Sequence, residues 1–154
     1  MNLSAKQQQE INDIVAGCEF PRGALLPVLH YLQQDKGYLS ENDLCAVAEA
    51  LNIPPVEVFG TATFYALFHT EPTGANVILA CNNISCHLRG AEMPLARLQK
   101  ELGIAPGQTT GDKKFTLYET SCLGACDRGP AMMINGRMYY ELTPDKIGQI
   151  LAQL

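Results

Sequence analysis

Apolar residues recur at helical spacing through the first half of the chain. Leu25, Val28, Leu29 and Leu32 fall on one face of a predicted helix, which Gly37 would end in a left-handed conformation. Ser40 is expected to cap the next helix, and Pro54-Pro55 is expected to open a further one at its permissive first turn. The helices predicted in this half span residues 4–17, 22–36, 41–51 and 55–67.

The last of these helices is apolar on most of its faces, which is typical of a helix buried between other elements. Aromatic residues are enriched in the cores of protein interfaces, but they build domain cores far more often. We therefore expect a core position for the aromatic cluster of Phe59, Phe64, Tyr65 and Phe68.

The second half of the chain alternates strands and helices. Asn135-Gly136 between two short apolar runs is a strong signal for a β-hairpin, and Thr143 is a typical N-cap. This order suits a small α/β sheet with helices on its faces. The predicted strands span residues 76–80, 115–119, 131–134 and 137–140, and the predicted helices span residues 91–102 and 144–153.

A short segment with Pro and Gly, residues 69–74, is the predicted boundary between the halves. The net charge of the chain differs on the two sides of this boundary. Residues 1–74 carry three Lys/Arg and nine Asp/Glu, a net charge of −6, whereas residues 75–154 carry eight and seven, a net charge of +1. We therefore predict an α+β protein with a helical domain at residues 1–72 and an α/β domain at residues 73–154.

The net charge of the whole chain, −5, argues against a nucleic-acid-binding protein, which usually carries a basic stripe. The N-terminus lacks the apolar run of a signal peptide, and no apolar stretch approaches the roughly 20 residues that span a bilayer. We expect a cytoplasmic protein without direct membrane insertion. Structural disulfides are rare in such a reducing compartment.

Four of the six cysteines stand in two pairs, Cys81-x4-Cys86 and Cys122-x3-Cys126, each following a predicted strand. Four thiolates are the ligand set of a [2Fe–2S] or [4Fe–4S] cluster, and they also hold a tetrahedral structural zinc. Zinc usually takes shorter Cys-x2-Cys spacings, and the glycines of the second loop would let backbone N–H groups approach cluster sulfides. The spacing favours iron–sulfur, while zinc, disulfides and free thiols remain alternatives.

The case for the remaining cysteines and for the histidines as metal ligands is weaker. Cys45 lies on the apolar stripe of its predicted helix, so we expect a buried thiol that packs like a small hydrophobe. Cys18 is expected in a loop or at a helix end, and not as a ligand. His87 directly follows the first pair, and histidine replaces cysteine in Rieske clusters, but four cysteines already suffice. His30 and His69 are interpreted as structural.

Four segments, in the same order along the chain, resemble one protein family: Gly60–Tyr65, Cys81–Gly90, Pro106–Thr110 and Ser121–Ile134. The spacing of the two cysteine pairs, together with Cys-Leu-Gly-x-Cys-x-x-Gly-Pro, is highly specific. The family that these motifs resemble is the [2Fe–2S] subunit of NADH:quinone oxidoreductase (complex I), a thioredoxin-like ferredoxin. The resemblance covers the chain from about residue 10 to its end.

The resemblance implies an N-terminal helical bundle followed by a thioredoxin-like α/β ferredoxin domain. It implies that Cys81, Cys86, Cys122 and Cys126 ligate one [2Fe–2S] cluster. It also implies docking on a larger subunit that binds FMN and NADH, at the periphery of the inner membrane through the complex. The implied function is electron transfer in an NADH dehydrogenase of the complex I type, in which the cluster exchanges one electron with FMN.

Three alternatives stand beside this function. The same subunit type is similar to the small iron–sulfur subunit of NAD-linked hydrogenases and formate dehydrogenases. A zinc-stabilised interaction module belongs to a different class. A thiol–disulfide reductase is disfavoured, because it needs Cys-x-x-Cys at a helix start.

The chain contains neither a Gly-x-Gly-x-x-Gly nor a P-loop fingerprint. We therefore expect it to bind no dinucleotide itself and to carry no catalytic residue. Hydride chemistry would be left to the flavin of the partner subunit, and this chain would be a one-electron acceptor.

Overall fold

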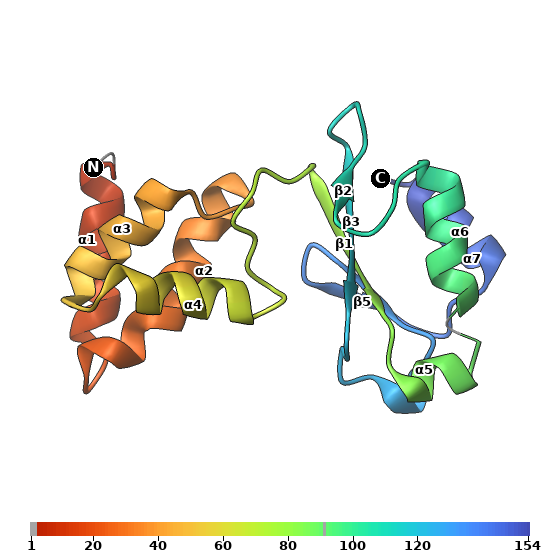
Figure 1. The fold of residues 1–154 in the computed structure, drawn as a ribbon, viewed down its shortest axis with the longest axis horizontal. Helices are drawn as coiled ribbons and strands as arrows, with labels where there is room; N and C mark the ends of the chain where they lie inside the picture. The colour runs from red at the N-terminus through yellow and green to blue at the C-terminus, as the bar shows by residue number, and fades with distance from the viewer. Residues whose placement is uncertain (1–2, 91) are drawn as a thin grey trace. The chain divides into compact units, whose positions relative to one another are not determined.

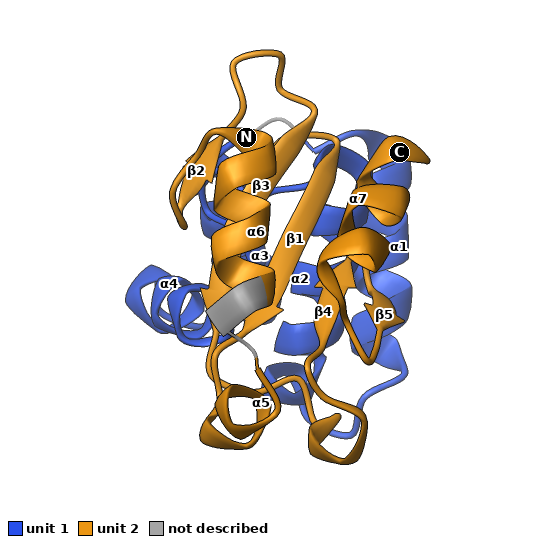
Figure 2. Cartoon of the chain, turned by 90° about the vertical axis from the view of Figure 1, so that its right-hand side faces the viewer, with its two compact units in different colours: residues 1–72 blue, residues 73–154 orange. Residues whose placement is uncertain are grey.

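The computed structural model describes residues 3–90 and 92–154, and Figure 1 shows how they fold. The chain divides into two compact units, residues 1–72 and residues 73–154, which Figure 2 colours blue and orange. Within the described residues, no helix combines the length and the apolar character that a membrane span requires.

The first unit is a helical bundle, and this prediction is confirmed. Its helices are α1 (Ala5–Ala16), the 3-10 turn η1 (Pro21–Ala24), α2 (Leu25–Lys36), α3 (Glu41–Leu51) and α4 (Pro55–Phe64). Each α-helix contributes to one core, for example through Ile11, Val28, Val47 and Val58, whose side chains are fully buried. Removal of these side chains from water is the main force that holds the bundle together.

Local signals fix the helix ends. Ser4 and Ser40 each form a capping box with the side chain three residues further on, which satisfies backbone N–H groups that the first helical turn leaves free. Gly37 follows α2 with φ at 79°, and Asn52 follows α3 with φ at 53°, both in the left-handed region. The predicted N-cap at Ser40 and the predicted end at Gly37 are confirmed.

An ion pair ties the end of α2 to the start of α3. The buried carboxylate of Asp43 accepts hydrogen bonds from Lys36 Nζ at 2.9 Å and from Ser40 Oγ at 2.6 Å. Burial by itself would raise the pKa of Asp43, but the hydrogen bonds from Ser40 and Lys36 outweigh it and hold the pKa below its ordinary value. The ionised carboxylate therefore stabilises the folded bundle.

Asp43→Asn is expected to lower the free energy of unfolding by about 1–3 kcal/mol, because the buried hydrogen-bond network loses its negative charge and one of its two acceptor oxygens. The wild-type protein should keep this contribution above about pH 4, the ordinary carboxyl pKa, and lose it as the pH falls through the lower pKa of the folded state. Urea denaturation of both proteins at a series of pH values measures the difference. A difference that stays constant down to about pH 2 would contradict the prediction.

Helix α4 differs from its prediction. It ends at Phe64 rather than at Leu67, and its buried residues are Val58 and Ala62. The prediction that this helix is buried on most faces is wrong, because the rest of the bundle packs against one side of it only (Figure 1).

The aromatic cluster is divided accordingly. Phe68 is buried and packs against the ring of His30, with centroids 4.7 Å apart. Phe59, Phe64 and Tyr65 are exposed by 53%, 79% and 42%. Their predicted position in the core is therefore wrong, and three aromatic side chains of this short segment face solvent.

The prediction for Cys45 is also wrong. The apolar stripe of α3 consists of Leu44, Val47, Ala48 and Leu51, all buried, whereas Cys45 is exposed. One residue turns a helix by about 100°, which carries Cys45 away from the stripe that begins at its neighbour.

The second unit is a sheet with helices. Its elements are β1 (Asn76–Cys81), α5 (Ile84–Leu88), α6 (Glu92–Leu102), β2 (Gln108–Thr109), β3 (Phe115–Thr120), η2 (Cys126–Arg128), β4 (Met132–Ile134), β5 (Arg137–Tyr139) and α7 (Pro144–Ala152). The five strands have the order β2-β3-β1-β4-β5. Strand β1 runs parallel to β3, and the other neighbours are antiparallel. Helices α6 and α7 cover the same face of the sheet (Figure 1).

Most elements of this unit follow the predicted pattern. The hairpin turns at Asn135 and Gly136, with φ at 48° and 80°, and Thr143 caps α7. Helix α5 and strand β2 were not predicted, because five and two residues are too few for a periodic pattern. The predicted start of α6 at Ala91 lies outside the described residues.

Candidate metal centre

The first cysteine pair lies at the end of the central strand. Cys81 is the last residue of β1, and Cys86 lies in α5, which Asn83 caps by accepting a hydrogen bond from the Ser85 N–H. The two cysteines are only 7% and 1% exposed, and a hydrogen bond joins their thiols. The short helix thus returns the chain to the end of the strand.

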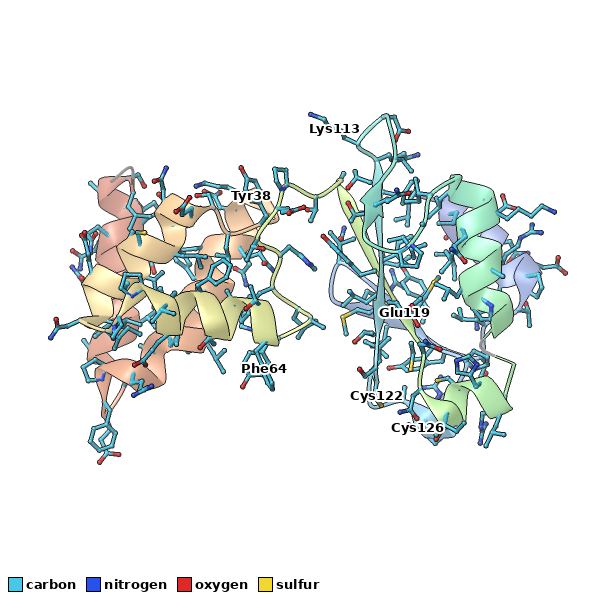
Figure 3. All side chains as sticks on the ribbon, in the orientation of Figure 1. Tyr38, Phe64, Lys113, Glu119, Cys122 and Cys126 are labelled. Atoms are coloured by element: carbon cyan, nitrogen blue, oxygen red, sulfur yellow. The ribbon has the colours of Figure 1, made fainter. Side chains whose placement is uncertain are left out.

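The second pair follows β3, the strand beside β1. Cys122 lies two residues beyond that strand and Cys126 begins η2, with their Sγ atoms 3.8 Å apart. Between them, the Gly124 N–H donates to Cys122 Sγ at 3.3 Å. Gly124 has φ at 76°, a conformation that a side chain would strain, so glycine permits this loop. Figure 3 shows Cys122 and Cys126 together at the end of the sheet that carries α5.

The two pairs meet because β1 and β3 are parallel neighbours, whose carboxyl ends lie at the same edge of the sheet. Gly129 lies so close to the first pair that a Cβ on it would stand 3.1 Å from Cys86 Sγ. Leu123 packs against Cys81 and Cys86. The structure therefore brings the predicted cysteines of both pairs together.

The thiols affect one another's ionisation. Burial raises the pKa of Cys86 to about 11, and the neighbouring Cys81 and Cys126 add to the rise. The hydrogen bond with Cys122, and the charge of that residue, raise the pKa of Cys126. Thiolates this close repel one another, so they coexist only when cations bind between them. Thiols are the donors that iron–sulfur clusters take from proteins.

The cysteines stand as two pairs on two loops. No set of three His, Cys, Asp or Glu side chains in residues 3–90 and 92–154 is arranged around the position of a single metal ion. In a [2Fe–2S] cluster each iron takes two of the four protein ligands, which is the division that two pairs supply.

Sequence reasoning missed two neighbours of the cysteines, Ala131 and Ser85. The backbone N–H of Ala131 donates to Cys86, and the side chain of Ser85 forms a hydrogen bond with Cys126, and both contacts lower the pKa of the thiol they reach. Gly129 is one of the two second-loop glycines that the sequence analysis singled out, and the structure places it against Cys86.

The second loop is also held from its far side. The Arg128 guanidinium lies 4.0 Å from the ring centroid of Tyr140, a cation–π contact. The carbonyl of Arg128 accepts a hydrogen bond from the Glu141 N–H at 2.9 Å, and that of Pro130 accepts one from the Leu142 N–H at 3.1 Å. These contacts fix the loop to the segment after β5.

The remaining cysteines and histidines are not members of the two pairs. Cys18 is half-buried and Cys45 is exposed, both in the first unit. The ring of His87 forms a hydrogen bond with the side chain of Asn82, beside the first pair. His69 is buried in the first unit, and burial lowers its pKa.

A family model described as thioredoxin-like [2Fe–2S] ferredoxin matches residues 11–154. The chain belongs to this family. The predicted fold, a helical bundle followed by a thioredoxin-like ferredoxin domain, is confirmed, and so is the family resemblance.

Named relatives extend this result. A subunit of the NADH-quinone oxidoreductase of Escherichia coli (strain K12) is 40% identical over 151 residues, which are 98% of this chain and 91% of that protein. The corresponding subunit from Pseudomonas aeruginosa is 36% identical over 149 residues. In the crystal structure of NAD+-reducing [NiFe]-hydrogenase in the air-oxidized state, one chain matches 81% of this chain with a TM-score of 0.69 and 30% identity. The match spans only 22% of that hydrogenase chain.

Gly129→Ala is expected to destabilise the second unit by about 1–2 kcal/mol, because its Cβ would crowd Cys86 Sγ and force the loop or the sulfur to move. Chemical denaturation, with the metal content recorded on the same samples, measures the effect. Gly148→Ala in α7 is the matched control. Its Cβ would meet only Arg97, at 4.0 Å, so this change is expected to be neutral or to stabilise by up to about 1 kcal/mol. Wild-type stability in Gly129→Ala would contradict the role of the close approach.

Proposed function

We propose that this protein is the electron-transfer subunit of an NADH:quinone oxidoreductase and that it holds one [2Fe–2S] cluster. The observation that carries the proposal is the gathering of thiols from two loops at one edge of the sheet, in a chain of the thioredoxin-like [2Fe–2S] ferredoxin family. The identity with the two NADH-quinone oxidoreductase subunits along nearly the whole chain supports the choice of complex. The proposed ligands are Cys81, Cys86, Cys122 and Cys126.

When bound, the cluster takes up and passes on single electrons, and the chain sets its surroundings. The N–H groups of Gly124 and Ala131 donate to the sulfurs of Cys122 and Cys86. Such donors favour the more negative, reduced state and so raise the reduction potential.

The two pairs differ in their access to solvent. Cys81 and Cys86 are buried under Leu123, which keeps water from that side of the site. Cys122 is exposed. The exposed side is therefore where a redox partner would approach closely enough to exchange an electron.

The proposed partner is a larger subunit that binds FMN and NADH. This chain has no dinucleotide fingerprint, and we assign it no catalytic residue. Hydride transfer would take place on the flavin, which then gives up its electrons one at a time. Through this partner the chain would lie at the periphery of the inner membrane.

A second candidate is the equivalent iron–sulfur region of an NAD-linked hydrogenase. The likeness to the NAD+-reducing [NiFe]-hydrogenase, at 30% identity, favours it. The formate dehydrogenase alternative stays a prediction from the resemblance. Purification of the tagged chain from its native host, followed by identification of quinone-reductase or hydrogenase subunits, separates these complexes.

The cluster itself is tested on purified protein. We expect brown protein with about two irons and two sulfides per chain and an EPR signal after reduction with dithionite. Colourless protein with stoichiometric zinc and no iron would instead favour the zinc-stabilised interaction module.

Replacement of any one of the four proposed ligands by Ala is expected to reduce cluster retention by about tenfold or more, since each iron would lose one of its two protein ligands. Iron and sulfide analysis of each variant measures the loss. Cys45→Ala is the control, because this thiol is exposed on α3 in the first unit. Equal iron loss in Cys45→Ala would show that the ligand set is wrong.

A further inference from the structure

A second apolar face of α4 is left open by the helical bundle. Val56, Phe59, Gly60 and Thr63 follow the i, i+3, i+4, i+7 spacing of one helix face, and Phe64 adjoins them. We refer to these five residues as the α4 face. The three large side chains among them are exposed by 74%, 53% and 79%, and Figure 3 shows the last, Phe64, projecting from the end of α4.

The α4 face carries no charge, although its half of the chain has a net charge of −6. The hydroxyl of Thr63 donates to the Phe59 carbonyl at 2.9 Å, so its hydrogen bond is made within the helix. Beside the face, Arg22 and Glu57 form an ion pair and balance each other's charge. An apolar surface can therefore cover the α4 face without burying an unpaired charge.

A groove adjoins the α4 face. It has a volume of about 580 Å³ and is lined by Leu25 and Leu26 on one side and by Gly60 and Phe64 on the other. A Cβ on Gly60 would meet no atom within 4 Å. The groove therefore has room for a side chain from another molecule.

Exposed apolar side chains are concentrated in this region. Of the nine large ones among the described residues, five lie between Val56 and Leu67. Soluble monomers rarely leave such a patch open, and aromatic residues are typical of interface cores. The concentration therefore points to a protein partner.

The lengths of two related chains bear on how a redox partner is held. In the NAD+-reducing hydrogenase, the matched region lies in one chain with a remainder more than three times as long, because the match spans 22% of that chain. The match to the Escherichia coli protein spans 91% of its length, so that protein has no comparable remainder. A subunit of that kind has to hold its redox partner through surface contacts alone.

We propose that the α4 face docks the flavin-bearing subunit, which presents an uncharged apolar ridge whose side chains enter the groove beside Gly60. This inference rests on the proposed function, since that function supplies the partner. Helix-in-groove contacts of this type place a few apolar anchors in a pocket and surround them with a polar rim. The rim here is the Arg22–Glu57 pair.

Gly60→Lys tests the docking surface without disturbing the bundle. The new side chain would fill the groove with a charge, but it meets no internal atom at its Cβ and replaces a residue that is unfavourable within a helix. The tagged chain is expressed in its native host and purified with the complex, and acid-released FMN is measured per tagged chain. We expect about a tenfold or greater loss of FMN, the size of a hot-spot effect, whereas the variant chain purified by itself keeps its iron content and EPR spectrum. Gly60→Ala, which leaves the groove open, should retain FMN.

Phe64→Ser and Phe20→Ser form a second, matched pair, since both rings are exposed but Phe20 lies outside the α4 face. Only Phe64→Ser is expected to lose FMN. Full FMN retention in Gly60→Lys would overturn the docking surface, as would a wild-type chain that brings down no FMN. The wild-type chain could also be a dimer that Gly60→Lys converts to a monomer while FMN is retained. That result would overturn the proposal and assign the α4 face to contact with a second copy of this chain. Failure of the proposed function is separate, because it would appear as a wild-type chain without iron.

Discussion

The parallel pairing of β1 with β3 is the constraint on which the site depends. Parallel neighbours end at the same edge of a sheet, so the chain leaves β1 at Cys81 and leaves β3 at Thr120 side by side. A parallel connection needs a crossover of a dozen or more residues, and here α5, α6 and β2 lie within it. The 35 residues between Cys86 and Cys122 hold most of this crossover and the whole of β3, so the two pairs lie far apart in sequence although the strand ends that carry them are adjacent.

The electrostatics of the site agree with this arrangement. Burial and neighbouring thiols raise the pKa values of Cys86 and Cys126, so the protein by itself disfavours the thiolates that a metal centre needs. The stability of the second loop has to come from other contacts, such as the stacking of Arg128 on Tyr140 and the backbone bonds to the segment after β5. The scaffold holds the donors in place, and bound cations would remove the repulsion between them.

Elements with a local signature could be predicted from the sequence. The N-cap at Ser40 and the turn at Asn135-Gly136 depend on residues within a few positions of one another, and the structure contains both. The approach of Gly129 to Cys86 could not be predicted, because it joins residues 43 positions apart and has no periodic pattern. The cysteine spacing identified the candidate ligands, but their grouping follows from strand order, which spacing alone does not determine.

The wrong prediction for α4 has a physical reason that bears on function. Apolar residues on most faces of a helix indicate that most faces leave water, but they do not say which molecule covers them. The bundle buries Val58 and Ala62, whereas Phe59 and Phe64 stay exposed. A sequence is selected for burial in the assembly in which the protein works, and a subunit shows part of that burial as exposed surface. The discrepancy between the predicted and the observed burial of α4 is what the proposed docking of the α4 face would produce.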